Sequence, residues 1–207
     1  MKKILGVSGS PIFNSNTDRT VKKVLESSGL KYKFIKLSDY NIGPCRACLA
    51  CVKTNRCVIK DDFQMVEQEL LESSALVVGG YTPFGMIDAF TKSFLERLYA
   101  THHKNLNKGK IFASIISSLD KKANEEAHKA LEKEAVVEKM IPISALSIEG
   151  NFMCNKCGLG NECENSGIKR RYGDKLKACL ENMVNVEDQD VWIEAEKLGK
   201  KIREYLI

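Results

Sequence analysis

Short apolar runs alternate with longer amphipathic segments through residues 1–150. Five apolar runs have the length and composition of buried strands, at residues 3–8, 31–39, 75–80, 110–118 and 143–150. The segments between them space their apolar residues three and four positions apart, which predicts helices over 16–29, 61–74, 88–100 and 121–139. Strands that alternate with helices form βαβ units. The pattern therefore predicts the α/β class, with a doubly wound, five-stranded parallel sheet.

Local signals mark the ends of several of these helices. Asn16 or Thr17 can cap the first helix, and Gly29 can end it. Asp61 and Gln64 have the spacing of a capping box at the start of the second. A last helix is predicted over 190–206, with an apolar face formed by Trp192, Ala195, Leu198, Ile202 and Leu206. We expect this face to pack on the sheet.

Length and composition favour one soluble globular domain over residues 1–207, since 43% of the residues are hydrophobic and 29% are charged. The amino-terminal MKKILGVSGS is interrupted by glycine and serine and lacks a cleavage site, so we interpret it as a first strand rather than a signal peptide. No apolar run approaches the ~20 residues of a membrane helix. We therefore expect a cytoplasmic protein that does not bind membranes.

The formal net charge is +5, with basic and acidic residues mixed along the helices. Such mixing is typical of a solvated surface, and the sequence contains no basic stripe or motif typical of nucleic-acid binding. We therefore expect no nucleic-acid partner. An acidic protein would still be attracted to the surface.

The first predicted strand runs into the polar loop SGSPIFNSNT, residues 8–17. Ligands of open parallel sheets bind at the carboxyl ends of the strands, and a helix amino terminus follows this loop directly. The loop lacks the lysine of a P-loop and the three glycines of a dinucleotide fingerprint. It suits a phosphate held by hydroxyl and backbone donors, and an ordinary polar loop is the alternative.

Four of the eight cysteines, Cys45, Cys48, Cys51 and Cys57, lie within thirteen residues. Cytoplasmic cysteines are normally reduced, so we expect metal ligands or redox groups rather than disulfides. Zinc sites usually pair two knuckles across a long loop, whereas this spacing allows one short loop to wrap an iron–sulfur cubane. A 4Fe-4S cluster is favoured, with zinc or free thiols as alternatives. Arg46, Lys53 and Arg56 are either partners for its negative charge or exposed cations.

A second cysteine segment, residues 151–180, precedes the last predicted helix. Cys154, Cys157 and Cys163 lie in a polar, glycine- and asparagine-rich stretch, and Cys179 is the one cysteine left over. Three close thiols with a distant fourth could hold a second 4Fe-4S cluster or a zinc ion, and free buried cysteines are the alternative. Cys179 is either the fourth ligand or a core residue.

The loop sequences SGSP and NSNT and the stretch CRACLACVKTNRCVIKDD resemble those of the NADPH-dependent FMN reductases and their relatives, the iron–sulfur flavoproteins of anaerobic archaea and bacteria. This resemblance implies a flavodoxin-like fold, FMN as cofactor and a 4Fe-4S cluster on Cys45, Cys48, Cys51 and Cys57. It places the FMN phosphate at Ser8, Ser10, Pro11, Asn16 and Thr17. GGYTPFG, residues 79–85, partly matches the family's ring-binding loop, which gives Gly80, Tyr81, Thr82, Pro83, Phe84 and Gly85 as further FMN contacts. The stretch SSLDKK after the fourth predicted strand adds Ser117, in the third loop that rims the flavin in this family.

In such proteins electrons enter at the cluster, pass to FMN of the same or a neighbouring subunit, and leave to a small acceptor. The resemblance thus implies an FMN-dependent oxidoreductase with ferredoxin or a similar one-electron donor, assembled as a homodimer or homotetramer. We expect residues 45–57 to lie beside the carboxyl ends of the strands, close to the flavin. Two alternatives remain: an NAD(P)H-dependent FMN or quinone reductase with structural metal, and a non-enzymatic redox or metal sensor.

Overall fold

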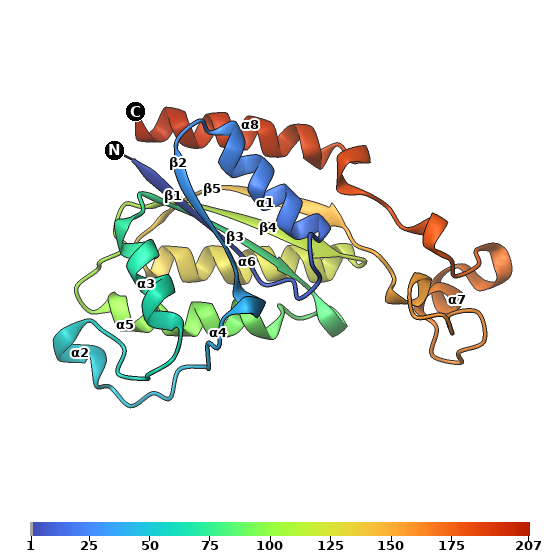
Figure 1. Cartoon of the computed structure of the whole chain (residues 1–207), viewed down its shortest axis with the longest axis horizontal. Helices are drawn as coiled ribbons and strands as arrows, with labels where there is room; N and C mark the ends of the chain where they lie inside the picture. The colour runs from blue at the N-terminus through green and yellow to red at the C-terminus, as the bar shows by residue number, and fades with distance from the viewer. Residues whose placement is uncertain (1) are drawn as a thin grey trace.

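The computed structural model of the protein describes residues 2–207, which form a central parallel sheet with helices on both faces (Figure 1). Its strands are β1 (Lys3–Ser8), β2 (Lys31–Lys36), β3 (Ala75–Tyr81), β4 (Ile111–Ser118) and β5 (Ile141–Glu149). Their order is β2-β1-β3-β4-β5, and every neighbouring pair is parallel. This is the strand order of flavodoxin-like sheets, so the predicted fold is confirmed.

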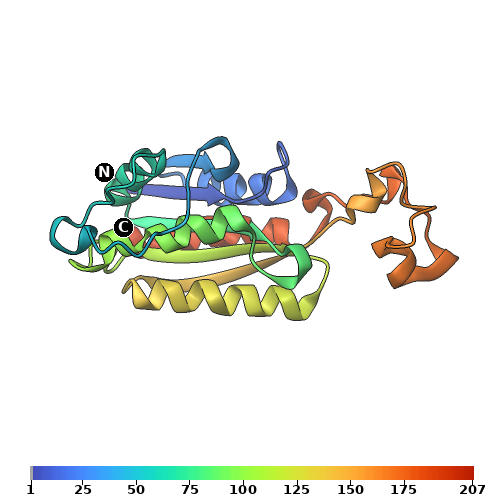
Figure 2. The same ribbon diagram turned by 90° about the horizontal axis from the view of Figure 1, so that it is seen from below.

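Helices cover both faces of the sheet, as Figures 1 and 2 show. They are α1 (Asn16–Ser27), α2 (Cys51–Thr54), α3 (Phe63–Glu72), α4 (Ala89–Arg97), α5 (Tyr99–His102), α6 (Lys121–Val137), α7 (Gly167–Tyr172) and α8 (Val191–Leu206). One apolar cluster joins α1 and α8 to the sheet, and a second joins α3, α4 and α6 to the opposite face. Within residues 2–207, no helix is long and apolar enough to cross a membrane.

The strands are buried on both sides because consecutive residues face opposite layers. Ile4 packs with α1 and α8, whereas Leu5 packs with α3 and α4, and both side chains are fully buried. Each such side chain stabilises the fold by about 1.5–3 kcal/mol. The predicted face of the last helix is also buried at Ala195, Leu198 and Ile202, which pack with residues of α1 and the sheet.

Several boundaries differ from the prediction. β2 ends at Lys36, because Leu37–Asp39 form a 3₁₀ turn, and the helix predicted over 88–100 breaks at Leu98 into α4 and α5. β5 begins at Ile141, and a bulge beside Phe112 of β4 accommodates Pro142 in this edge strand.

The predicted helix caps also differ. Ser15, not Asn16 or Thr17, caps α1, and its capping box is closed by Asp18. The capping box predicted at Asp61 and Gln64 does not form. The Asp61 carboxylate accepts from Phe63 N at 3.1 Å, and it also binds a buried arginine described below.

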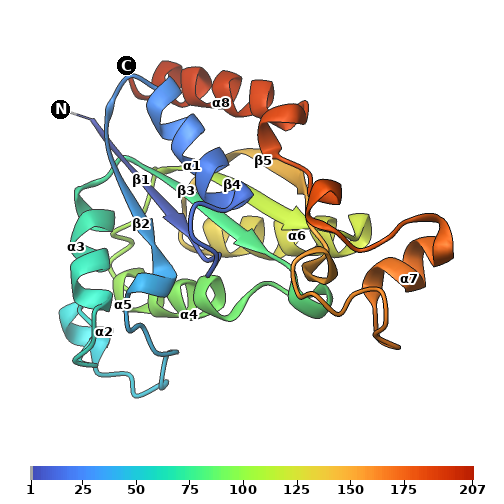
Figure 3. The same cartoon turned by 45° about the vertical axis from the view of Figure 1, so that its right-hand side comes forward.

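The second cysteine segment extends from the carboxyl end of β5, away from α2 (Figures 1 and 3). Asparagine side chains hold its two halves together by pairing with backbone groups. Asn151 and Asn161 each form reciprocal hydrogen bonds with the backbone of one partner, Val184 and Ala178 respectively. These side-chain hydrogen bonds take the place of the backbone hydrogen bonds that two paired strands would form.

Candidate functional site

A cavity of about 800 Å³ opens at the carboxyl edge of the sheet. Its walls come from the loops after β1, β3, β4 and β5, which is where doubly wound sheets bind their ligands. This volume lies within the range of small-molecule and cofactor sites. We refer to it as the sheet-edge cavity.

A network of charged and hydroxyl groups shapes the loop after β1. Ser8 Oγ donates to Asp18 Oδ1 at 2.6 Å, and Lys36 Nζ at the end of β2 donates to Asp18 Oδ2 at 2.7 Å. Lys36 also donates to the carbonyl oxygens of Ser10 and Ile12, at 2.6 and 2.8 Å. The buried carboxylate is thus neutralised, and the loop is fixed around the start of α1.

The start of α1 suits an anion. Ser10 and Thr17, both at least 95% buried, line the cavity beside the amino terminus of this twelve-residue helix. Unpaired N–H groups and the helix dipole favour negative charge there. Asn16 also lines the cavity, but its amide donates to Val184 O at 3.0 Å and accepts from Arg19. Asn16 therefore joins the helix to the chain that follows the second cysteine segment.

The loop after β3 presents an aromatic ring. Phe84 is fully exposed and has a φ of 52°, in the left-handed region that non-glycine residues rarely adopt. Such strain costs of order 1–3 kcal/mol and occurs mainly where a ligand is held. Asp88 fixes the loop by accepting from the backbone N–H groups of Tyr81 and Thr91, and burial raises the pKa of its carboxyl group. An apolar, flat ligand surface fits this wall.

Most of the predicted FMN contacts lie on the cavity lining. These are Ser10, Pro11, Asn16, Thr17, Tyr81, Thr82, Pro83, Phe84, Gly85 and Ser117. Ser8 and Gly80 do not line it. The Ser8 hydroxyl is turned to Asp18, and Gly80 packs so closely that an added Cβ would lie 2.7 Å from Ile87 Cδ1. Both residues shape the loops from behind.

Sequence reasoning missed one wall of the cavity. It comes from residues 151–153 and Lys156 of the second cysteine segment and from the residues that flank this segment, Gly150 and 183–185. The one sequence signal for it was its position directly after β5, since the loops after parallel strands gather at the same edge. This segment therefore borders the ligand in addition to carrying cysteines.

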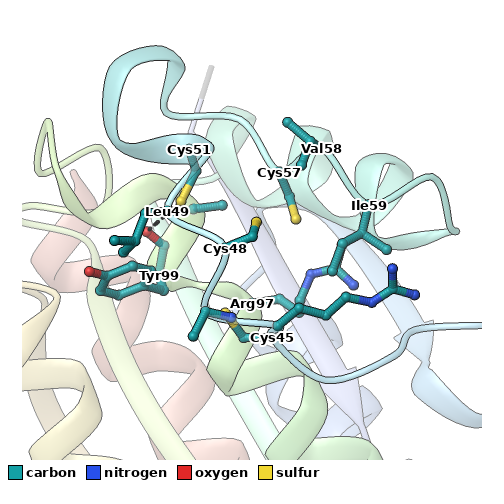
Figure 4. Close-up of a pocket in the computed structure, with 12 residues that line it drawn as sticks. Cys45, Cys48, Leu49, Cys51, Cys57, Val58, Ile59, Arg97 and Tyr99 are labelled. Atoms are coloured by element: carbon teal, nitrogen blue, oxygen red, sulfur yellow. Dashed lines mark hydrogen bonds between the residues drawn. The ribbon is translucent and has the colours of Figure 1, made fainter.

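The first four cysteines line a second, smaller pocket between the loop after β2 and the end of α4. Figure 4 shows Cys45, Cys48, Cys51 and Cys57 around it, with Arg97 and Tyr99 beside them. We call it the four-cysteine pocket. Cys45 N donates to Glu96 Oε2 at 3.3 Å, and the Cys51 thiol is 4.0 Å from Tyr99 O. Helices α4 and α5 therefore anchor the cysteine loop.

The four thiols influence one another. Burial raises the pKa of the Cys51 thiol, and the neighbouring Cys57, Cys45 and Cys48 sulfurs raise it further. Across residues 2–207, however, no three Cys, His, Asp or Glu side chains stand close enough to form a ready metal site. A cluster would have to draw the sulfurs together, and thiolate is the ligand that iron–sulfur clusters require. The residue types and their shared pocket fit such a group.

The four-cysteine pocket does not lie beside the sheet-edge cavity, so that expectation is wrong. The two share no lining residue. Helix α4 starts at the carboxyl end of β3 and runs back along the sheet, and its nine residues span about 13 Å. The cysteine loop packs at the far end of α4, and α2 and α7 lie at opposite ends of the molecule (Figures 1 and 2).

The second group of cysteines lies around α7 and the turn that carries Cys154. The Cys154 thiol is beside the amino terminus of α7, where burial opposes ionisation but the Gly167 and Ile168 N–H groups lower the pKa of the thiol overall. Cys179 is brought nearby, because its N–H donates to Asn155 Oδ1 at 3.3 Å. Cys157 is exposed, and its thiol is 3.5 Å from Cys154 O.

Comparisons with known proteins give the family. Residues 2–152 match the sequence pattern of the family described as NADPH-dependent FMN reductase. The chain is 31% identical over 98 residues to an iron–sulfur flavoprotein of Methanocaldococcus jannaschii, covering 46% of this chain and about half (51%) of that relative. It is 29% identical over 146 residues to an iron–sulfur flavoprotein of Archaeoglobus fulgidus, covering 69% of this chain and 72% of the relative.

Solved structures confirm the fold. A flavodoxin from the domain Archaea superposes with a TM-score of 0.54 at 16% identity, covering 99% of this chain and 97% of that one.

Proposed function

The chain belongs to the NADPH-dependent FMN reductase family and is an FMN-dependent oxidoreductase, and we propose that it works as an iron–sulfur flavoprotein. In this proposal Cys45, Cys48, Cys51 and Cys57 would hold a 4Fe-4S cluster that would supply one-electron chemistry, and the sheet-edge cavity would hold FMN within reach of a small acceptor. The observation that carries the proposal is that all four cysteines of the first group line one pocket. Their spacing also resembles that of iron–sulfur flavoproteins.

For FMN, the start of α1 would hold the phosphate. Ser10 and Thr17 supply buried hydroxyl groups there, and Lys36 fixes the loop without reaching the lining itself. Phe84 offers a free ring face to the flavin ring. Once bound, FMN supplies both one- and two-electron chemistry.

The separation of the two sites supports electron transfer between chains. A nine-residue helix lies between the four-cysteine pocket and the cavity of the same chain, so we propose that the cluster serves the flavin of a neighbouring subunit. Exposed Leu49 and Val58 line the four-cysteine pocket, and exposed Val52 follows Cys51, so these side chains would give such a contact an apolar surface. A homodimer or homotetramer would place the cluster of one chain next to the flavin of another.

Mixing two defective chains tests this arrangement. Cys48→Ala chains would lack the cluster, and chains with Thr17→Glu would repel the FMN phosphate. Neither should reduce an acceptor with electrons from ferredoxin. Mixed oligomers that regain part of the parent rate would support transfer between chains. Mixed oligomers that stay inactive, although both cofactors are present, would refute it.

We propose ferredoxin or a similar acidic carrier as the donor. The net charge of +5 and the exposed cations Arg46 and Lys53 beside the four-cysteine pocket support this choice. Steering by exposed charges weakens as salt screens them over ~10 Å at 0.1 M. The rate of reduction by ferredoxin should therefore fall with ionic strength, and a salt-independent rate would argue against an acidic donor.

We further propose that Cys154, Cys157 and Cys163 hold a second cluster or a zinc ion, with Cys179 as the fourth ligand. Asn155 supports this proposal, because it ties the backbone of Cys179 to the turn that carries Cys154. The pKa of Cys154, lowered by backbone N–H groups, also favours the thiolate that metals bind.

A further inference from the structure

A buried arginine closes one side of the four-cysteine pocket. The Arg97 side chain is fully buried at the end of α4, and its guanidinium group lies 4.5 Å from the centre of the Phe63 ring. Nη1 and Nη2 donate to the two carboxylate oxygens of Asp61, at 2.6 and 3.0 Å. Asp61 is itself only 7% exposed, so the pair is shielded from salt and water.

This pair holds the base of the cysteine loop. Arg97 Nη1 donates to Gly43 O at 3.0 Å, and Gly43 N donates to Asp61 at 3.2 Å. The next residue, Asp62, accepts from Asn41 N at 2.7 Å. The two ends of the segment that carries the four cysteines are therefore fastened together around one guanidinium group.

One donor of Arg97 is left over. Its Nε is buried and has no hydrogen-bond partner, although buried polar groups are normally paired and an unpaired one costs stability. The same side chain lines the four-cysteine pocket. Burial lowers the pKa of Arg97, but the Asp61 carboxylate and the nearby Cys57 sulfur outweigh this effect and raise it overall. The positive charge of Arg97 therefore borders a pocket lined by four cysteines, and its buried Nε–H is free to donate.

We propose that Arg97 is the positioning residue that fastens the cysteine loop and stabilises the reduced form of a cluster bound there, by its charge and its free Nε–H. This inference rests on the proposed iron–sulfur function. Four thiolates make the site anionic, and each added electron makes it more so. A guanidinium held in place at low exposure therefore favours the reduced state, since hydrogen bonds and net charge set cluster potentials.

The test is the midpoint potential of the cluster in a variant that replaces both members of the ion pair with uncharged side chains. Arg97→Gln combined with Asp61→Asn leaves no unpaired buried carboxylate, and of the two charges it removes only that of Arg97 borders the pocket. We expect the equilibrium between reduced and oxidised cluster to shift about tenfold towards the oxidised form, or 59 mV for one electron. Redox titration followed by electron paramagnetic resonance measures it. Arg56→Gln is the control, because Arg56 is on the same loop but 60% exposed, and its loss should shift the equilibrium less than about twofold.

Iron and flavin contents complete the test. A variant that keeps its FMN but loses its iron also supports the role of Arg97 in fastening the loop. If the double variant does not fold, Arg97→Lys tests the fastening role alone: it keeps the positive charge, but one ammonium group cannot form the paired hydrogen bonds to Asp61 and Gly43, so the iron content should fall. A parent-like potential with parent-like iron content would overturn the inference alone. A parent protein that binds FMN but no iron would overturn the proposed function and this inference with it.

Discussion

Lys36 Nζ lies 2.7 Å from the carboxylate of Asp18, and this pair connects the end of β2 to the first turn of α1. Both side chains are largely buried, at 11% and 2% exposure. Lys36 lies outside the cavity lining, yet it holds two carbonyl oxygens of the loop and cancels the negative charge of Asp18 behind the proposed phosphate position. The affinity of the site for a phosphate therefore depends on a residue that does not touch it.

Lys36→Met should weaken FMN binding by at least about tenfold, because the unpaired Asp18 carboxylate would then repel the phosphate and the loop would loosen. Fluorescence titration of the flavin-free protein with FMN measures the effect. Lys33→Met is the matched control, since Lys33 is exposed on the same strand. Equal FMN affinity in the two variants would show that the pair does not support the phosphate site.

Thr17→Val should weaken FMN binding by about tenfold, because it removes a buried hydroxyl that can donate to a charged phosphate and keeps the side chain's shape. Thr20→Val is a useful comparison. Thr20 is one turn further along α1, and its hydroxyl donates to Asn16 O at 2.7 Å and does not reach the cavity lining. If both variants lose affinity equally, the loss reflects the helix and not a contact with the phosphate.

His128 makes the stability depend on pH. Its ring lies between Ser114 Oγ, 2.7 Å from Nδ1, and Ser147 Oγ, 3.3 Å from Nε2, and burial lowers its pKa to about 4. A histidine of the unfolded chain titrates near 6.5, so between these values the unfolded state binds more protons. The free energy of unfolding should therefore decrease as pH falls through this window, by about 1–3 kcal/mol in all.

Urea denaturation across that pH range measures the effect. In His128→Gln the part of the pH dependence that His128 contributes should disappear, because glutamine can still pair with the serines but does not titrate. A variant with the same pH dependence as the parent would assign the effect to other groups.

Cys157→Ala should lower the metal content by one zinc ion or one cluster per chain and leave the FMN and the first cluster in place. Metal analysis after anaerobic purification measures this loss. Cys179→Ala should have the same effect if Cys179 is the fourth ligand. Unchanged metal content in Cys157→Ala would mean that the second cysteine group is not a metal site.

The sequence predicted the fold because the sheet's burial is a local, periodic property. Residues such as Ile4 and Leu5 are apolar in continuous runs, as strands covered on both faces require. The predicted family is also confirmed, because the loop motifs on which it depends are short and contiguous in the sequence. The shared pocket of the four cysteines also follows from their close spacing.

The position of that pocket could not be predicted from the local sequence. It depends on the contact between Asp61 and Arg97, which are 36 residues apart, and Asp61 has the local pattern of a helix cap. The wall that Phe152 and Met183 add to the cavity is likewise a long-range contact within a segment that lacks periodicity. Tertiary contacts of this kind override local signals.

The central claim is that one chain carries two separate cofactor sites. The most direct test is to measure iron, sulfide and FMN in the parent protein and two variants, all purified anaerobically. The parent should contain FMN and a 4Fe-4S cluster at the first cysteine group. Cys48→Ala should lose that iron and keep its FMN, whereas Thr17→Glu should lose FMN and keep the iron. If either substitution removed both cofactors from a folded protein, or if the parent contained no iron, the account of two separate sites would be contradicted.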